Sequence, residues 1–147
     1  MQMNEQPFIT VSIFLKGNQL DPDYISETLG IRPSRSQKKG EKRGGTRPNS
    51  KTYITKSGTW RVRIDNKSRT AQDMISEVPQ MVGELLQMFD GRQEPLDKIA
   101  GVEEAYLDIL VLGDGTDKSE DSTEFILLKE QILRISQLGI AVCATVS

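Results

Sequence analysis

Basic side chains crowd one stretch of this 147-residue chain, and their types and spacing suggest a definite chemistry. Residues 32–69 hold thirteen Lys/Arg against two acids, a local balance of +11, with Gly40, Gly44 and Gly45 among them. A cationic, glycine-containing segment can wrap a phosphate backbone and supply affinity that does not depend on base sequence. The candidate phosphate-binding residues, within the basic segment 32–51, are Arg35, Lys38, Lys39, Lys42, Arg43 and Arg47.

Two features argue against a specialised phosphate site in the basic segment. The spacing GxxxxGK[ST], with which P-loops cradle nucleotide phosphates, occurs nowhere in the chain. No aromatic residue is interleaved with the basic ones before Tyr53, so the segment alone offers bases no stacking surface. Because charged loops are most often simply solvated, we hold nucleic-acid or phosphate-ligand binding as the alternative hypothesis.

An acidic cluster offers the opposite chemistry. Residues 70–147 hold fifteen Asp/Glu against five Lys/Arg, so the net charge of −2 hides a polarised chain. The EF-hand order of ligands is absent, which leaves either a solvated hairpin tip or carboxylates presented to the basic cleft of a partner such as a nuclease. The candidate partner-binding residues, in a loop over 113–124, are Asp114, Asp117, Glu120, Asp121 and Glu124.

Several functions are disfavoured by what the chain lacks. There is no histidine, which removes Ser-His-Asp and Cys-His catalysis and histidine-ligated zinc. The single cysteine, Cys143, allows no intramolecular disulfide, and we expect a buried, inert thiol in a reducing cytoplasm. No run of eighteen apolar residues and no signal-peptide pattern is present, so we expect no membrane partner. We therefore expect no enzymatic activity, no metal site and no cofactor.

The elements that must position these residues can be predicted from periodicity. Residues 8–16 alternate as a half-buried strand, and Asp21, Pro22 and Gly30 mark the start and end of a short helix. Residues 34–51 lack periodicity and predict a mobile loop. Strands at 52–55 and 59–64 then form a hairpin, in which Trp60 points to the core while Arg61 and Arg63 point outward.

The second half of the chain predicts two further helices and the rest of the sheet. A helix begins at Thr70, with a kink or restart expected at Pro79, and another covers 129–138. Residues 105–112 form an inner strand, 125–128 its hairpin partner, and 140–146 the last strand. The fold class is α+β: a single domain over 1–147, with one mixed or antiparallel sheet of five to six strands, helices mainly on one face, and an element order that suggests two related halves.

Three landmarks in this order carry a family resemblance. They are the helix exit Leu-Gly-Ile-Arg-Pro at 29–33, the basic glycine-containing loop, and the strand entry Ser-Gly-Thr-Trp at 57–60. Together they resemble a widespread bacterial family of small domains of unknown function, some members of which look like toxin-immunity proteins. The resemblance implies a bacterial cytoplasmic protein with no catalytic residues to transfer. Our main hypothesis is therefore a non-enzymatic domain that binds a protein partner, most sharply an immunity protein that neutralises a toxin, possibly a nuclease.

Overall fold

A curved, mixed β-sheet carries three α-helices on one face, in a computed structural model that describes residues 9–44, 52–66, 71–112 and 125–146. The strand order is β2-β5-β1-β6-β7, with antiparallel pairing except between β6 and β7, which are parallel. The strands of this sheet are β1 (Ile9–Gly17), β2 (Arg35–Gln37), β5 (Gly58–Asn66), β6 (Glu104–Val111) and β7 (Ala141–Val146). A separate antiparallel pair is formed by β3 (Lys42–Gly44) and β4 (Thr52–Ile54).

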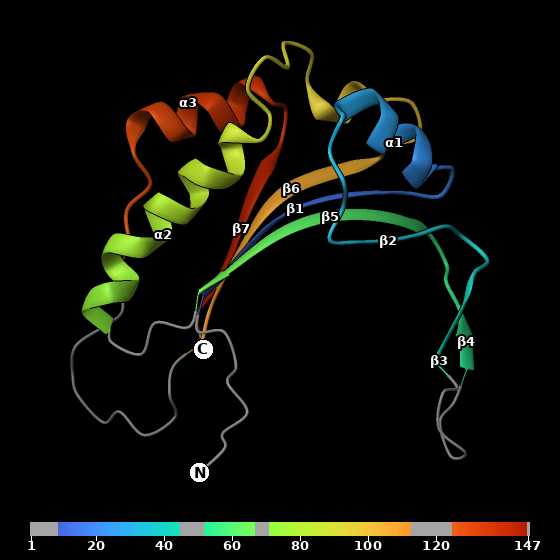
Figure 1. Ribbon diagram of the computed structural model, residues 1–147, viewed down its shortest axis with the longest axis horizontal. Coiled ribbons are helices and arrows are strands. Elements are labelled where there is room, and N and C mark those ends of the chain that lie inside the picture. The colour runs from blue at the N-terminus through green and yellow to red at the C-terminus, as the bar shows by residue number, and fades with distance from the viewer. Residues whose placement is uncertain (1–8, 45–51, 67–70, 113–124, 147) are drawn as a thin grey trace.

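The helices lie on the convex side of the sheet, and the concave side is left open (Figure 1). They are α1 (Pro22–Leu29), α2 (Ala71–Gln87) and α3 (Lys129–Gln137), with a short 3-10 turn, η1 (Leu96–Lys98), before β6. The predicted α+β class, with one mixed sheet and helices on one face, is confirmed. Among the described residues, no helix has the length and apolar character needed to cross a membrane.

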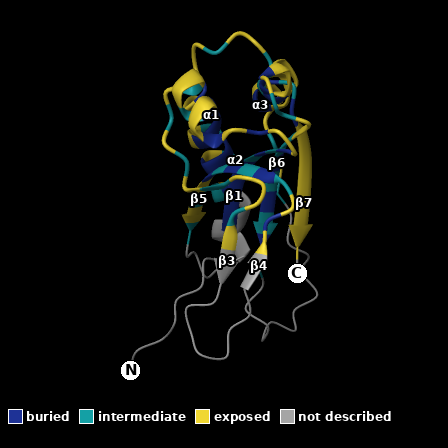
Figure 2. Cartoon of the chain, turned by 90° about the vertical axis from the view of Figure 1, so that its right-hand side faces the viewer, coloured by how far each residue is buried: buried dark blue, intermediate teal, exposed yellow. Residues whose placement is uncertain are grey.

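The core lies between the sheet and the helices, and β1 is its centre. Ile9, Val11, Ile13 and Leu15 alternate along β1 and are fully buried, as the period of two predicts (Figure 2). Their register neighbours on β5 and β6 point to the same face and meet the apolar stripe of α2. The members from these elements are Trp60, Val62, Leu107, Ile109, Val111, Val78, Met81, Val82, Leu85 and Leu86.

Helix α1 begins and ends where the sequence predicts. The side chain of Asp21 accepts a hydrogen bond from the backbone N–H of Asp23 at 3.1 Å, and Pro22 occupies the first turn. Gly30 adopts a left-handed φ of 68°, and its N–H donates to the carbonyl of Ser26 at 2.8 Å. These caps set the direction in which the chain leaves α1 toward β2.

Gly30→Ala is expected to lower the free energy of unfolding by about 1 kcal/mol, because an L side chain is strained at this φ. A Cβ at this position would meet no atom within 4 Å, so the loss isolates backbone strain from steric overlap. Urea denaturation measures this change in the free energy of unfolding. Gly83→Ala in the middle of α2 is the control and should leave stability unchanged or raise it, since α2 is helical there and the only atom near the new Cβ is an amide nitrogen of Gln131 at 3.3 Å.

Two predictions about strands are wrong, for reasons of pairing. Residues 125–128 are irregular and form no strand; the chain after β6 instead crosses through α3 and returns as β7, parallel to β6, which requires a long connection. The predicted hairpin between 52–55 and 59–64 is also absent, since β4 pairs with β3 while β5 pairs with β1 and β2.

Three local expectations also change. The stretch 34–51 contains two short strands, because backbone pairing with β5 and β4 stabilises β2 and β3 without an apolar pattern. The restart that Pro79 could impose is absent, because α2 is one continuous helix across this residue. Cys143 is exposed, because β7 lies at the edge of the described sheet and Cys143 shares the open face with its register partner, Asp108.

Candidate functional site

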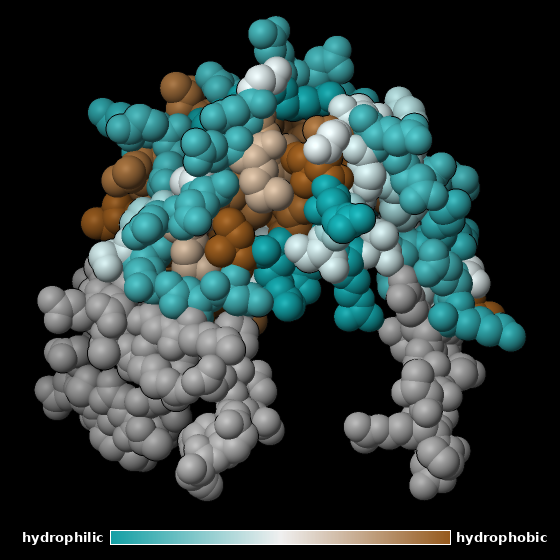
Figure 3. Space-filling view, in the orientation of Figure 1, coloured by the Kyte–Doolittle hydropathy of each residue, from teal (hydrophilic) through white to brown (hydrophobic). Residues whose placement is uncertain are grey.

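The open face of the sheet carries every second residue of each strand, because these residues point away from the helices. On β1 these residues are Thr10, Ser12, Phe14 and Lys16. Their register partners on β5 include Arg61 and Arg63, two residues that the sequence places outside the core. A sheet face without helices and with several charged side chains is the most distinctive surface among the described residues (Figures 1 and 3).

One row of side chains crosses all five strands of this face. In register order from β2 to β7 it contains Arg35, Arg61, Phe14, Tyr106 and Ala141, which we call the cross-strand row. The guanidinium carbon of Arg61 lies 4.7 Å from the centroid of the Phe14 ring. The Phe14 and Tyr106 rings stack with centroids 5.1 Å apart at 19°. The row therefore places two cations, two aromatic rings and then a single methyl group side by side.

Lys16 adds a second cation above the aromatic rings of the row. Its ammonium nitrogen lies 5.3 Å from the Phe14 centroid and 5.2 Å from the Tyr106 centroid, so it bridges both rings. Arg35 and Arg61 are direct register partners on β2 and β5, a juxtaposition of like charges that destabilises a sheet by itself. A bound anion between these cations would remove that cost.

A hollow of about 260 Å³ opens where these cations meet. The space-filling view shows hydrophilic side chains along the concave side of the sheet (Figure 3). Described residues that line the hollow include three cations, one aromatic ring and no carboxylate: Phe14, Lys16, Arg35, Ser36, Gln37, Thr59 and Arg61. The composition suits a ligand that carries negative charge.

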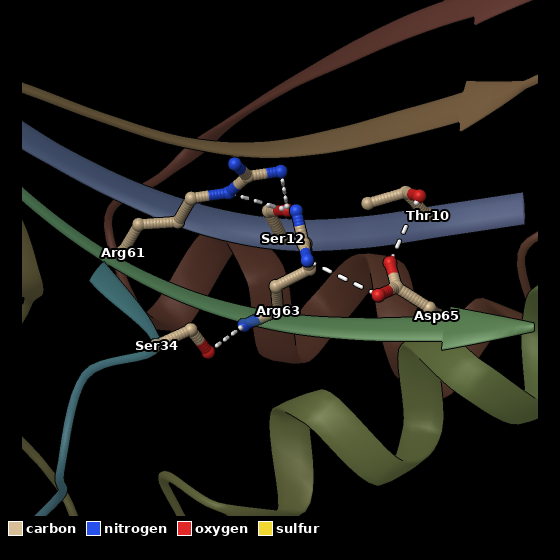
Figure 4. Close-up of polar contacts among 6 residues, drawn as sticks. All are labelled: Thr10, Ser12, Ser34, Arg61, Arg63 and Asp65. Carbon is tan, nitrogen blue, oxygen red and sulfur yellow. Dashed lines mark hydrogen bonds and ion pairs between the residues drawn. The ribbon is translucent and has the colours of Figure 1, made fainter. Parts of the chain in front are cut away.

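Ser12 on the neighbouring strand β1 holds the Arg61 side chain in place. Both Nε and Nη2 of Arg61 donate hydrogen bonds to Oγ of Ser12, at 3.1 and 3.0 Å, and Ser12 is fully buried (Figure 4). Partial burial, together with the neighbouring charges of Arg63 and Arg35, lowers the pKa of Arg61, although Asp108 and Asp65 oppose this. The group stays charged at neutral pH, and a nearby anion would stabilise it further.

Arg63 is neutralised within the same face. Its Nε lies 3.2 Å from a carboxylate oxygen of Asp65, whose other oxygen accepts a hydrogen bond from the hydroxyl of Thr10 at 3.0 Å (Figure 4). The backbone N–H of Arg63 donates to Oγ of Ser34, which fixes the chain as it enters β2. Among described carboxylates none forms an ion pair with Lys16, Arg35 or Arg61, so the free positive charge gathers at the hollow.

A larger cavity, about 530 Å³, lies between the C-terminal ends of α1 and α2. Its basic residue, Arg92, is satisfied internally: Nη2 lies 3.7 Å from the Glu94 carboxylate and Nε donates to the Glu94 carbonyl. Asp90 and Glu94 both line this cavity. Its lining thus has no uncompensated positive charge to recognise an anionic ligand, and we place the candidate site at the hollow instead.

The structure brings one of the predicted basic residues, Arg35, into the hollow and separates the others. Lys38 lies 3.9 Å from Asp21 beside α1, and Lys39 is exposed near it. Lys42 is exposed on β3. The side chain of Arg43 and all of Arg47 lie outside the described residues.

The predicted acidic site also lies outside the described residues. This applies to Asp114, Asp117, Glu120, Asp121 and Glu124 alike. Within the described chain no group of three or more His, Cys, Asp or Glu side chains is arranged to hold a metal ion.

Sequence reasoning missed the residues that join Arg35 at the hollow or in the cross-strand row. Lys16, Phe14 and Tyr106 were assigned to strands without a functional role, although the alternation of β1 already places Phe14 and Lys16 on the non-core face. The missing information was the strand order, which sets β6 and β5 on either side of β1.

Comparison with protein-family models gives a match over residues 7–144, to a domain of unknown function, DUF4279. The chain belongs to the DUF4279 family. The resemblance to small domains of unknown function is therefore confirmed across nearly the whole sequence. Searches of curated proteins and of solved structures found no match.

Proposed function

We propose that this DUF4279 domain binds single-stranded nucleic acid on its open sheet face. The observation that carries the proposal is the cross-strand row, in which Arg61, Phe14 and Tyr106 adjoin a hollow lined by Lys16 and Arg35. Proteins that bind single strands combine a positive groove for the backbone with aromatic rings for the bases. The absence of aromatic residues in the basic segment, which weighed against nucleic acid, is offset by rings from β1 and β6.

The cationic end of the cross-strand row suits the phosphate of a nucleotide, and its aromatic end suits the base. Phosphate oxygens would accept hydrogen bonds from Arg35, Arg61 and Lys16 at the hollow, where no described carboxylate competes. Arg61 and Tyr106 flank Phe14 on neighbouring strands, whereas Tyr106 has only the exposed Ala141 on its other side. A base would therefore stack on Tyr106 above Ala141, at the edge of the row.

Replacing Tyr106 with leucine is expected to weaken binding to a fluorescent single-stranded oligonucleotide about tenfold, because base stacking contributes about 1–3 kcal/mol per base. Leucine keeps an apolar side chain on the strand but removes the ring. Tyr24→Leu is the matched control, since Tyr24 is an exposed tyrosine on α1, on the helical side of the sheet. Fluorescence anisotropy at several salt concentrations gives the affinities.

Arg35→Gln tests the contact between the cations of the hollow and phosphate in the same assay, with Lys98→Gln on η1 as the control. Removal of one phosphate contact is expected to reduce the slope of log K against log salt by about 0.7 for a single strand. The proposal fails if Tyr106→Leu and Tyr24→Leu bind equally, or if inorganic polyphosphate competes as well as the oligonucleotide per phosphate. Equal effects of Arg35→Gln and Lys98→Gln would also contradict it.

Toxin immunity through the acidic loop stays a prediction. Its candidate contacts, Asp114 to Glu124, lie outside the described residues, so the arrangement of the open face neither favours nor opposes it. A protein partner retained after nuclease treatment, and displaced when Asp117, Glu120 and Asp121 become Asn or Gln, would support immunity.

A further inference from the structure

In the part of the chain that the structure describes, strand β7 forms an edge of the sheet that lacks the usual protection against further pairing. Natural edge strands carry charges, proline or bulges, or are very short. The opposite edge, β2, has three residues and carries Arg35, whereas the six residues of β7, AVCATV, include no charge, proline or glycine. All six are exposed, and β6 is the one described strand that pairs with β7.

Exposed apolar side chains gather beside this edge. Val142 and Val146 are register partners of the buried Leu107 and Val111, so they point toward the helix side of the sheet, yet about half of each is exposed. Figure 2 shows α3 above β7, at the side of the sheet away from α1. Helix α3 contributes Ile132, which is 56% exposed. An apolar patch next to an open strand edge is typical of an interaction surface.

The orientation of α3 is determined by its polar contacts with α2 and with the residues that directly follow it. Nε2 of Gln131 donates to the carbonyl of Pro79, and Nη2 of Arg134 donates to the carbonyl of Phe89, both at 2.6 Å. Ile132 follows Gln131 by about 100° around the helix, on the side away from Arg134. Figure 2 shows α3 over β7. Because Gln131 and Arg134 face the α2 segment, helical spacing places the exposed Ile132 on the side of α3 away from α2.

We infer that β7 pairs with the β7 strand of a second copy of this chain. Two identical strands related by a two-fold axis pair antiparallel, and each supplies the backbone donors and acceptors that the other lacks. With the two-fold axis at Ala144, Val142 of each copy lies opposite Val146 of the other, and an uncharged strand brings no like charges together. A charged partner would find no complementary charge on the strand.

The size of this surface indicates a weak dimer. Six residues at 3.3 Å each make β7 about 20 Å long, and a sheet with one helix layer is about 20 Å deep. The footprint of about 400 Å² on each copy, about 800 Å² in total, lies below the roughly 1,200 Å² of stable interfaces and in the range of weak ones. We expect monomer and dimer to exchange at micromolar concentrations.

Analytical ultracentrifugation over a range of concentrations tests the dimer, with adjacent residues of α3 as a matched pair. Ile132→Glu should weaken self-association at least tenfold, because it buries a charge at the interface. Leu133→Glu should leave self-association unchanged, since Leu133 is similarly exposed, at 61%, but lies a further 100° around the helix. A chain that sediments as a monomer at every concentration, or equal effects of the two variants, would overturn the inference.

Cys143 supplies an independent readout. It is the only cysteine of the chain and lies exposed in the middle of β7, so antiparallel pairing brings two copies of it close together. A short bis-maleimide should link wild-type and Leu133→Glu chains into covalent dimers and should fail with Ile132→Glu. Failure to link the wild-type chain at high concentration would contradict β7 pairing, and thermal unfolding verifies that both variants fold.

The dimer has a consequence that rests on the proposed function. A two-fold axis normal to the sheet leaves both open faces on the same side, with seven strand spacings between the two β5 strands, at most about 34 Å. One oligonucleotide could then contact both hollows. An oligonucleotide long enough for one hollow tests the proposed nucleic-acid binding alone. An increase in affinity with oligonucleotide length tests the dimer, so a failure of the dimer can be distinguished from a failure of the proposed function.

Discussion

Replacing Trp60 with alanine is expected to lower the free energy of unfolding by about 3–5 kcal/mol, a large part of the stability of a domain of this size. Trp60 is fully buried in the core, opposite Leu15 on β1 and Ser36 on β2. Its indole Nε1 donates a hydrogen bond to Oγ of Ser26 at 3.1 Å, which ties β5 to α1. The substitution would remove both the largest buried side chain and this link.

Two milder variants separate these contributions. Ser26→Ala keeps the ring but leaves the indole N–H without its acceptor, at an expected cost of about 1 kcal/mol. Trp60→Phe should give an intermediate loss. Urea denaturation followed by far-UV circular dichroism is the suitable measurement, because Trp60 is the only tryptophan and its fluorescence disappears with it. A loss for Trp60→Ala no greater than that for Ser26→Ala would contradict the assigned core role.

Elements with local signals could be predicted from the sequence. The alternation of β1 placed Ile9, Val11, Ile13 and Leu15 in the core. Asp21 and Pro22 at the start and Gly30 at the end defined α1 nearly to the residue. These signals are local because burial on one face and capping act over a few neighbouring residues. Trp60 as a core residue and β6 as an inner strand follow from the same reasoning.

Features that depend on non-local pairing could not be predicted. Strand β2 has only three polar residues, and it forms because β5 offers an edge beside it, where the Ser34 N–H donates to the carbonyl of Arg61 at 2.7 Å. The candidate site has the same origin. Arg35, Phe14 and Tyr106 are far apart in sequence, and only the strand order brings them into one row. A search of the sequence for clustered charges therefore finds Arg35 but not Phe14 or Tyr106.

Arg61 provides the sharpest test of how the open face works, because its charge and its position can be removed separately. Arg61→Gln is expected to weaken oligonucleotide binding at least tenfold and to reduce the salt slope by about 0.7, since one charged contact is lost. Ser12→Ala keeps the charge but removes the acceptor of both Arg61 hydrogen bonds. It should weaken binding only about threefold and leave the salt slope unchanged.

The double variant decides whether Ser12 acts through Arg61. If Ser12 only positions the guanidinium, Ser12→Ala in the Arg61→Gln background should cause no further loss of affinity, so the two effects will be strongly non-additive. Additive losses would mean that Ser12 has another role, and an unchanged salt slope in Arg61→Gln would mean that the guanidinium does not contact phosphate. Because Ser12 is fully buried at the centre of the sheet, unfolding of each variant must be measured alongside. The change in salt slope then distinguishes a lost phosphate contact from a weakened fold.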